Sequence, residues 1–274
     1  MLHNSLVLGT EVFSGNWGKP FSEVVAEEIL LHAYKNELKE LDSAPSYGEL
    51  SMVEKLIGKI IKKNSLKFKI ASKFKINRDA NTSINQILKE VREQLDNSLK
   101  NLNTDCLSIY YFHSGSDDNF FIDEVWSYLN KRKKLGDIEK LGLSIKHELV
   151  INDKLKQLYH AKNYGISTVQ TVLNLYSDQS LKKVIPYCQE NDIEIYGRMP
   201  FAKGLLTGEY QNKESFIKND PRAGSVLSEN IIKFKLRNNN LSLEKVIKWP
   251  LKNAKKIVFS VKNIKQLAEI VNIS

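Results

Sequence analysis

The sequence has few of the features that mark secreted, metal-binding or membrane-spanning proteins. Its 274 residues contain two cysteines, Cys106 and Cys188, which lie far apart and form neither a C-x-x-C motif nor a metal-ligand spacing. We therefore expect reduced thiols and no metal site. No segment approaches the roughly 18 apolar residues of a membrane span, and residues 1–5 lack the basic and apolar regions of a signal peptide. These absences predict a cytoplasmic protein without a membrane partner.

Linker sequences and internal repeats are also missing. The 6 prolines and 13 glycines are scattered, and no long tract of Gly, Ser or Pro divides the chain. With 42% hydrophobic and 27% charged residues, the chain has enough apolar material to fill one large core. We therefore expect a single domain over residues 1–274.

Negative charge is in deficit, since the formal net charge is +9. The basic residues form four short clusters, which we expect at helix ends, where cations complement the helix dipole: Lys62-Lys63, Lys131-Arg132-Lys133-Lys134, Lys182-Lys183 and Lys255-Lys256. No basic stripe with interleaved aromatic residues is present, so we expect no nucleic-acid partner. A basic nucleic-acid-binding protein remains an alternative, and salt-sensitive retention of DNA or RNA would reveal it. A basic surface also suits an anionic dinucleotide or a phosphorylated substrate.

Short apolar runs alternate with longer segments of helical period, which indicates repeated βα units and a parallel sheet. The runs predict eight strands, at Leu6–Gly9, Glu40–Asp42, Phe68–Ser72, Cys106–Phe112, Ile138–Leu143, Thr168–Val172, Ile193–Tyr196 and Ile257–Val261. Eight such units in a chain of this length predict an α/β protein with the (β/α)8 fold of the TIM barrel.

Helical periodicity fills the segments between these strands. The predicted helices cover about 22–38, 49–63, 82–102, 122–135, 149–164, 181–191 and 225–237, followed by a last barrel helix that begins near Ser242. Thr82 is the expected N-cap of the third helix. Pro186 should bend its helix or lie in its first turn, and Pro250 should kink or stop the last one.

Four proton-active side chains lie at or just beyond the ends of consecutive predicted strands: Asp42, Tyr47, Lys73 and His113. Each has an ordinary alternative role, since Asp42 can cap a turn, Tyr47 can pack, and Lys73 can face solvent. His113 can be a satisfied core histidine. In a barrel, however, all strand C-termini open on one face, so these residues are expected to converge on one pocket.

The motifs that contain these residues resemble the aldo-keto reductase family. The D-S-A-P-S-Y-G run at 42–48, followed by Glu54 and Gly58, is similar to the family's D-T-A-x-x-Y-G-x-x-E-x-x-x-G signature. The I-A-S-K run at 70–73 resembles its I-x-[ST]-K strand. Residues 98–113 resemble its S-L-x-x-L-x-x-D…Y-x-x-H stretch. The similarity extends from about residue 8 to residue 267 and implies an NAD(P)H-dependent carbonyl reductase.

Reduction of a carbonyl explains why these residue types belong together. The oxygen needs a proton, and a free tyrosine, with a pKa of about 10, is a poor acid at neutral pH. An ammonium at Lys73 would favour the phenolate of Tyr47, and Asp42 would keep that ammonium charged. A neutral His113 could donate a hydrogen bond to the substrate oxygen. The resemblance implies the same four roles, with Tyr47 as the general acid.

The resemblance also implies a cofactor site along the later strands. Ser144 and Gln170 would contact the nicotinamide, Arg198 would stack on it, and the loop after it would bind the pyrophosphate. Lys262 and Asn263 would approach a 2′-phosphate, which favours NADPH over NADH. The complete expected set is Ser144, Gln170, Arg198, Phe201, Lys203, Gly204, Leu205, Ser260, Lys262, Asn263 and Gln266.

Several positions depart from the family pattern. Ile145 stands where an asparagine usually holds the carboxamide, Phe259 and Ser260 replace a proline and a glycine, and Ile270 replaces an adenine-contacting asparagine. Asn174 matches the family, although a cap at a strand end is an equally good role for it. These departures keep open a cofactor-binding barrel that regulates or scaffolds with little turnover.

The sequence does not identify the substrate or the oligomeric state. We expect a small-molecule carbonyl compound, selected by loops at 11–21, which includes Trp17, at 114–121 and at 210–240. The chain ends at Ser274, soon after the eighth strand, without the long C-terminal segment of many relatives. We therefore expect an open pocket that suits a bulky or sugar-linked carbonyl.

Overall fold

The computed structural model describes most of the chain. It covers residues 2–15, 21–79, 81–177, 179–207, 225–238 and 241–273, together with residues 210, 212, 216, 220, 222 and 223. Trp17 lies outside the described residues, as does most of the 210–224 part of the predicted substrate loop.

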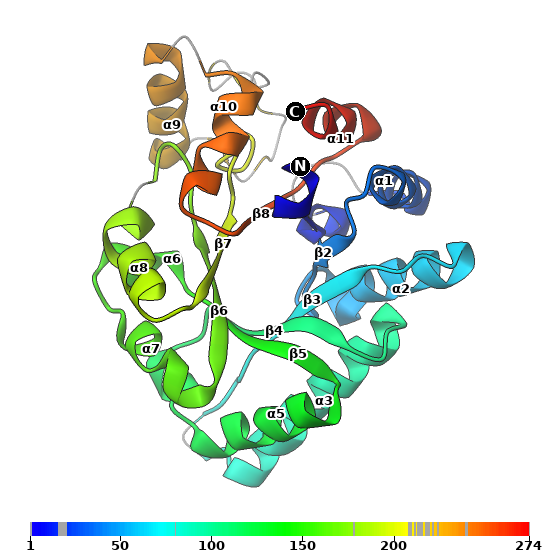
Figure 1. The fold of residues 1–274 in the computed structure, drawn as a ribbon, viewed down its shortest axis with the longest axis vertical. Helices are drawn as coiled ribbons and strands as arrows, with labels where there is room; N and C mark the ends of the chain where they lie inside the picture. The colour runs from blue at the N-terminus through cyan, green and yellow to red at the C-terminus, as the bar shows by residue number, and fades with distance from the viewer. Residues whose placement is uncertain are drawn as a thin grey trace.

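The described strands form one closed parallel barrel in which each strand pairs with its neighbours in sequence and β8 pairs with β1 (Figure 1). They are β1 (Leu6–Gly9), β2 (Glu40–Asp42), β3 (Lys69–Phe74), β4 (Leu107–His113), β5 (Ile138–Ser144), β6 (Ile166–Val172), β7 (Glu194–Arg198) and β8 (Lys256–Phe259). The predicted α/β class and (β/α)8 fold are therefore confirmed.

Several strands extend further toward their C-terminal ends than the apolar runs predicted. Lys73 lies inside β3, where it pairs in register with Tyr111, and His113 is the last residue of β4. Ser144 and Arg198 likewise end β5 and β7. The backbone ladder continues through these residues because both neighbouring strands are present to pair with it. Their polar side chains therefore project from rigid strands, not from loops.

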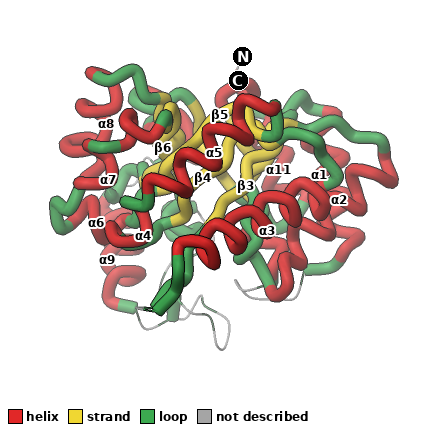
Figure 2. The backbone as a smooth tube through the Cα atoms, turned by 90° about the horizontal axis from the view of Figure 1, so that it is seen from below, coloured by secondary structure: helices red, strands yellow, loops and turns green. Residues whose placement is uncertain are grey.

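Helices surround the barrel, as the tube in Figure 2 shows for the strands enclosed by helical segments. The longer ones are α1 (Glu23–Lys35), α2 (Met52–Asn64), α3 (Ile84–Leu102), α5 (Asp123–Leu135), α8 (Gln179–Glu190), α9 (Val226–Arg237), α10 (Leu243–Lys248) and α11 (Ile264–Val271). The shorter ones are η1 (Leu2–Ser5), η2 (Glu11–Ser14), η3 (Glu49–Ser51), α4 (Asp117–Phe120), α6 (His147–Ile151), α7 (Lys156–Tyr159), η4 (Ala161–Tyr164) and η6 (Pro250–Lys252).

Three helix predictions need correction or refinement. The single helix expected at 149–164 is broken into α6, α7 and η4, and Asp153 between the first two has a positive φ of 57°. The cap of α3 is Ser83, whose capping box with Gln86 is complete, and not Thr82. Pro186 lies inside α8, beyond its first turn. Pro250 behaves as expected, since α10 ends at Lys248 and the proline opens η6.

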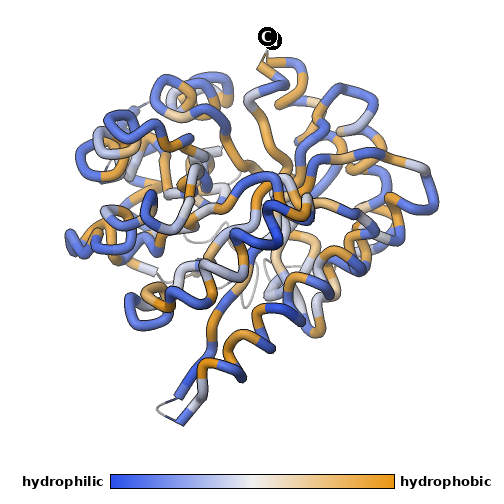
Figure 3. The backbone as a smooth tube through the Cα atoms, turned by 60° about the horizontal axis from the view of Figure 1, so that its bottom comes forward, coloured by the Kyte–Doolittle hydropathy of each residue, from blue (hydrophilic) through white to orange (hydrophobic). Residues whose placement is uncertain are grey.

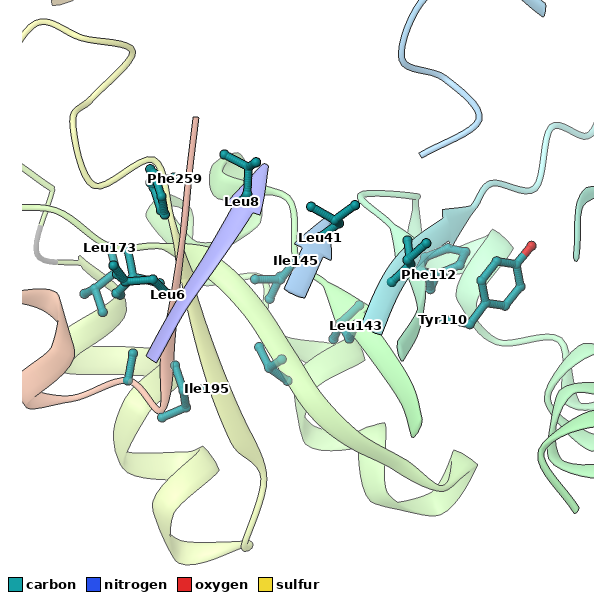
Figure 4. Close-up of a cluster of buried hydrophobic side chains, with 14 of the residues drawn as sticks. Leu6, Leu8, Leu41, Tyr110, Phe112, Leu143, Ile145, Leu173, Ile195 and Phe259 are labelled. Atoms are coloured by element: carbon teal, nitrogen blue, oxygen red, sulfur yellow. The ribbon is translucent and has the colours of Figure 1, made fainter. Parts of the chain in front are cut away.

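Apolar side chains form two separate layers. The larger cluster joins residues of the strands and of the turns directly after them, several of which are labelled in Figure 4, to the inner faces of the helices. In Figure 3 the hydrophobic positions of the helices accordingly alternate with hydrophilic ones. The smaller cluster takes the alternate strand positions and fills the barrel: Val7, Ala71, Ile109, Tyr111, Tyr196 and Val258. The barrel interior is therefore packed below its mouth.

The glutamate and glycine of the first motif tie helices to the barrel. Glu54 is fully buried on α2, and its carboxylate accepts hydrogen bonds from Ser72 Oγ at 2.6 Å and Ser98 Oγ at 3.0 Å. Burial raises the pKa of Glu54. A Cβ on Gly58 would lie 1.9 Å from the carbonyl oxygen of Asn101, so only glycine lets α2 approach α3 this closely. Glu54 and Gly58 therefore have structural roles, because they determine how α2 packs against the barrel and against α3.

Ion pairs close the N-terminal end of the barrel. Glu194 at the start of β7 pairs with Lys140 of β5 at 2.7 Å and with Lys255, while Lys256 of β8 pairs with Glu40 of β2. Lys255-Lys256 therefore opens a strand and does not end a helix, which corrects the prediction. Lys182-Lys183 lies near the N-terminal end of α8, where its charge opposes the helix dipole. The other two clusters lie in the last turns of α2 and α5, as expected.

Candidate active site

A large cavity opens at the C-terminal end of the barrel. Its volume is about 1040 Å³, and its lining comes from the ends of the strands and the loops that follow them. Ligand pockets typically have roughly 300–1,000 Å³, so this one has room for an extended ligand. Of the four predicted catalytic residues, Asp42, Tyr47 and His113 line the cavity directly, and Lys73 lies beneath them with 1% of its side chain exposed.

Lys73 connects two of the other predicted catalytic residues. Its ammonium donates to Asp42 Oδ1 at 2.6 Å, to the Ser43 carbonyl at 2.8 Å and to the Tyr47 hydroxyl at 3.0 Å. An ammonium has three donors and no acceptor, so all of its hydrogen-bonding capacity is used. Burial lowers the pKa of Lys73, but the charges and hydrogen bonds of Asp42 and Tyr47 together outweigh this, and the net direction is upward. The group is therefore a fixed positive charge beneath Tyr47.

The second carboxylate oxygen of Asp42 leads to the predicted cofactor residues. Gln170 Nε2 donates to Asp42 Oδ2 at 2.8 Å, and Ser144 Oγ donates to Gln170 Oε1 at 3.2 Å. Both side chains are buried at the floor of the cavity. One hydrogen-bonded chain thus runs from Ser144 on β5 through Gln170 on β6 to Asp42 on β2. It continues through Lys73 on β3 to Tyr47.

Tyr47 keeps its proton in this setting. Burial raises its pKa to about 12, although the ammonium of Lys73 acts in the opposite direction. Lys73 thus acts on the pKa of Tyr47 in the direction that we expected, toward the phenolate. Its effect is smaller than the effect of burial. Because Lys73 donates to the tyrosine oxygen, the hydroxyl hydrogen is left to point toward another acceptor.

His113 is neutral. Burial, followed by the positive charges of Lys73, Lys75 and Arg198, lowers its pKa to about 2. Its ring lies edge-on to Tyr47 with centroids 6.3 Å apart. Within the described part of the chain, neither ring nitrogen has a hydrogen-bond partner, and the side chain lines the cavity. A neutral imidazole has one donor available for a ligand.

The loop after β7 lines the cavity with backbone in an unusual conformation. Met199, Ala202 and Lys203 have φ between 46° and 60°, and Gly204 has a φ of 86°. A tight turn of this kind can present backbone N–H groups to an anion, although the Ala202 N–H is already bonded to the Met199 carbonyl at 2.9 Å. Arg198, Phe201, Lys203 and Gly204 all line the cavity.

Leu205 is the exception among the loop residues assigned to the cofactor. Its side chain is buried in the hydrophobic core, it does not line the cavity, and its N–H bonds to the Ala202 carbonyl. The geometry therefore gives it a packing role.

The loop after β8, the strand that pairs with β7, also lines the cavity. Ser260, Lys262, Asn263 and Gln266 all line it. Asn263 Oδ1 caps α11 by accepting from the Gln266 N–H at 2.9 Å, and Gln266 Oε1 accepts from the Lys262 N–H at 2.7 Å. The amide side chains thus shape the loop, and the ammonium of Lys262 is the charged group that it presents.

The structure also places two residues that depart from the family pattern, Ile145 and Ile270, and one that matches it, Asn174. Ile145 is fully buried in the apolar cluster of Figure 4, and its carbonyl accepts from Arg198 Nη2 at 3.3 Å. Ile270 lines the cavity with an apolar surface. Asn174 Oδ1 accepts from the backbone of Tyr176 and Ser177, so it caps the turn after β6.

Five charged cavity residues were missed by the sequence interpretation: Glu11, Lys75, Arg222, Lys265 and Glu269. Arg222 ion-pairs with Asp220, donates to the Lys203 carbonyl and lies over the Tyr210 ring at 4.5 Å. Arg222 falls within the predicted substrate loop at 210–240, but nothing in the local sequence indicates what it packs against. Lys75 follows β3 by one residue, the position from which a barrel strand points side chains at its mouth, and this signal was available.

Other predicted absences can be compared with the described residues. Both cysteines are free, and Cys188 is buried. No helix in the described ranges is long and apolar enough to cross a membrane. No group of three His, Cys, Asp or Glu side chains among those residues is arranged to hold a metal ion.

Curated proteins with similar sequences are aldo-keto reductases. The chain is 30% identical over 211 residues to aldo-keto reductase yakc [NADP(+)] of Schizosaccharomyces pombe, an alignment that covers 74% of this chain and 60% of the relative. It is 26% identical over 223 residues to aldo-keto reductase YhdN of Bacillus subtilis, covering 78% of this chain and 63% of the relative. These alignments thus span less than two thirds of the relatives' length.

Solved structures share the fold. The glycerol dehydrogenase of Gluconobacter oxydans superposes with a TM-score of 0.78 at 20% identity, covering 98% of this chain and 86% of that one. The holo form of an aldo-keto reductase from Bacillus halodurans gives a TM-score of 0.73 at 20% identity, with the same coverages. The sequence model of the aldo/keto reductase family matches residues 5–274. The chain therefore belongs to the aldo/keto reductase family.

Proposed function

We propose that the chain reduces an aldehyde or ketone to an alcohol, with NADPH as hydride donor, NADH as the alternative donor, and Tyr47 as proton donor. The observation that carries this proposal is the buried ammonium of Lys73, which donates one hydrogen bond each to Asp42, to the Ser43 carbonyl and to the hydroxyl of Tyr47 in the cavity. A protein that only binds a ligand gains nothing from a charge held beneath a protonated tyrosine.

The cavity fits a nicotinamide dinucleotide, the cofactor class that this family uses. Its floor presents Ser144 and Gln170, whose polar groups suit a carboxamide, and its rim presents Lys203 and Lys262, whose charges suit phosphates. The left-handed turn at 202–204 adds backbone donors for a pyrophosphate. A bound cofactor of this class supplies a hydride to the carbonyl carbon. The printed name of the yeast relative includes NADP(+), which supports NADPH here.

The residues of the chain supply the proton and orient the substrate. Tyr47 donates its proton to the carbonyl oxygen as the carbon gains a hydride and its two electrons, so the products are an alcohol and oxidised cofactor. Lys73 stabilises the phenolate that this step leaves, because the ammonium already lies 3.0 Å from its oxygen. His113 donates a hydrogen bond to the same carbonyl oxygen. Tyr47 then recovers a proton from water.

The test is the Tyr47→Phe variant. It removes the transferable proton and keeps the ring, so we expect kcat to fall by about 10²–10⁴ while the dissociation constant for NADPH changes by less than about threefold. Steady-state NADPH oxidation with a panel of aldehydes and ketones measures the first quantity, and fluorescence titration measures the second. Tyr159→Phe is the matched control, because Tyr159 is 52% exposed and does not line the cavity.

Two results would contradict the proposal. If Tyr47→Phe reduces carbonyls as fast as the parent, the tyrosine is not the acid. If the parent binds NADPH tightly and oxidises it with none of the carbonyl compounds, the chain is a cofactor-binding barrel with a regulatory or scaffolding role.

A further inference from the structure

Two buried cations contact the loop that follows β7. Arg222 lies just before α9 and is 5% exposed, and Lys235 lies on α9 and is 9% exposed. Neither is a member of the proposed proton-transfer network. Burying a charge is costly unless it is paired and hydrogen-bonded, so the contacts that these two groups make indicate why they are buried.

Arg222 joins the loop after β7 to the residues that follow it. Its Nε and Nη2 donate to the two carboxylate oxygens of Asp220 at 2.8 and 2.5 Å. Nη2 also donates to the Tyr210 hydroxyl at 2.7 Å, and Nη1 donates to the Lys203 carbonyl at 2.5 Å. A guanidinium has five N–H donors, so these four bonds leave one N–H on Nη1. The carboxylate balances the charge, and the other donors serve the loop.

Lys235 is bonded to main-chain oxygens of the same loop. Its Nζ donates to the Thr207 carbonyl at 3.0 Å and to the Tyr210 carbonyl. The ammonium forms no ion pair with a carboxylate in the part of the chain that the structure describes, and burial lowers its pKa. Because Lys235 does not line the cavity, it can influence a ligand there only through the loop that it holds.

These contacts fix the part of the loop that lines the cavity. The Lys203 carbonyl belongs to the same planar peptide as the Gly204 N–H, so the bond from Arg222 sets the direction of both groups. The guanidinium carbon lies 4.5 Å from the centre of the Tyr210 ring, which stacks on Phe216 with centroids 4.9 Å apart. A Cβ on Gly204 would lie 3.4 Å from the Tyr210 ring, so the ring packs against the turn.

The conformation of this turn needs such support. Ala202 and Lys203 have φ of 46° and 59°, and left-handed backbone is unfavourable for residues other than glycine. Residues in this conformation persist only where the surrounding structure holds them. Lys203 and Gly204 line the cavity. The turn that needs support is therefore the one that we propose to bind phosphate.

We propose that Arg222 and Lys235 are positioning residues that hold the loop after β7 in the shape that binds the phosphates of the dinucleotide. The inference rests on the proposed cofactor site and assigns part of its affinity to two residues that we do not place among its contacts. A loop that is already ordered raises affinity, because the entropy of ordering it is not lost on binding. One cation comes from α9 and the other from the turn before it, so each can be removed separately.

The test measures NADPH affinity in Arg222→Met and Lys235→Met, which remove the donors and keep an unbranched side chain. We expect each change to raise the dissociation constant of NADPH about tenfold in a fluorescence titration. Arg222→Lys, which keeps the charge, should recover part of the loss. At saturating NADPH, kcat should change by less than about twofold, so the effect appears in the KM for NADPH.

A second ligand separates positioning from a general effect on the fold. Adenosine 2′-monophosphate lacks the pyrophosphate and carries the phosphate that the Lys262 loop is proposed to bind. Its inhibition constant against NADPH should change by less than about twofold in both variants, because that loop is a separate site. If Arg222→Met does not fold, the same comparison is made with Lys235→Met and Arg222→Lys.

Arg132→Met is the matched control. Arg132 also pairs with an aspartate, Asp137 at 2.5 Å, and donates to a tyrosine hydroxyl, that of Tyr128 at 2.6 Å. It lies on α5 and does not line the cavity. We expect Arg132→Met to lower stability in urea unfolding, as Arg222→Met does, and to leave the dissociation constant of NADPH at its parent value.

Three outcomes would overturn the inference while leaving the reductase function intact. Parent affinity for NADPH in both variants would show that the loop does not depend on the cations. A loss in Arg222→Met alone would make that guanidinium a direct ligand of the cofactor. An equal loss for NADPH and for adenosine 2′-monophosphate would assign both residues to the fold. If the parent binds neither NADPH nor NADH, the proposed function fails, and the inference fails with it.

Discussion

The buried pair of Lys73 and Asp42 has both a chemical and a structural consequence. Their side chains are only 1% and 4% exposed, and their nitrogen and oxygen lie 2.6 Å apart. Removing two charges from water is expensive, and the cost is recovered only when every polar atom finds a partner. Here Ser43, Tyr47 and Gln170 complete the bonding. The proposed proton-transfer site therefore depends on a complete network.

We predict that Lys73→Met destabilises the protein more than it would if the pair were exposed. The carboxylate of Asp42 would stay buried without its cation, which costs about 3–5 kcal/mol in the free energy of unfolding. Adding Asp42→Asn to Lys73→Met should recover part of that loss. Urea unfolding of the two single variants and the double variant measures the coupling, and strictly additive effects would show that the residues do not stabilise each other.

The sequence predicts best those elements in which apolar residues mark the buried face and polar residues mark the exposed face. The helix at 84–102 has an apolar stripe and a polar outer face, so its existence and end were correct. The predicted ends of β3, β4, β5 and β7 came too early, because the last one or two residues of each strand include a polar side chain that interrupts the apolar run. A strand in a barrel is defined by pairing on both edges, which local sequence does not contain.

The break in the predicted 149–164 helix has a similar cause. Asp153 adopts a left-handed conformation between α6 and α7, and the long-range fit of these short helices against α8 and α4 determines where the chain turns. In the active site, the motifs located Asp42, Tyr47, Lys73 and His113. They gave no indication that Arg198 has no ion pair with a carboxylate among the described residues, because a missing partner can be recognised only when the neighbours in space are known.

The N-terminus of α3 tests the corrected cap. Ser83 Oγ accepts from the Gln86 N–H, and Gln86 Oε1 accepts from the Ser83 N–H at 2.8 Å. We predict that Ser83→Ala lowers the free energy of unfolding by about 1 kcal/mol, since a capping hydroxyl is lost. Thr82→Ala, the neighbouring change, removes two exposed hydrogen bonds within the Asp79–Thr82 turn and none to the helix, so it should cost less. Thermal or urea unfolding compares the two, and a larger effect at Thr82 would restore it as the cap.

At the scale of the whole barrel, the two ends have different tasks. The C-terminal end holds the cavity and the polar network, whereas the N-terminal end is closed by the ion pairs of Glu40 and Glu194. An apolar layer separates them inside the barrel. In barrels of this class, residues at the N-terminal end generally serve stability. Changes there should therefore alter unfolding and leave the proposed chemistry unaffected.

Glu194→Gln provides the test of that division. Burial raises the pKa of Glu194, but hydrogen bonds from Lys140 and Lys255 outweigh it and the net direction is downward. The carboxylate therefore stabilises the fold above the pKa of an unfolded glutamate, about 4.3, and this stabilisation is lost as the pH falls through the lower folded-state value.

We expect Glu194→Gln to cost about 1 kcal/mol at pH 7, a modest value because the pair is partly exposed, and nothing once the parent carboxylate is protonated. Urea unfolding at pH 7 and in acid measures both, with Glu190→Gln as the control, since Glu190 is exposed on α8 and has no ion pair among the described residues. The kcat of Glu194→Gln should match the parent at pH 7. A loss of turnover without a loss of stability would show that the two ends of the barrel are coupled.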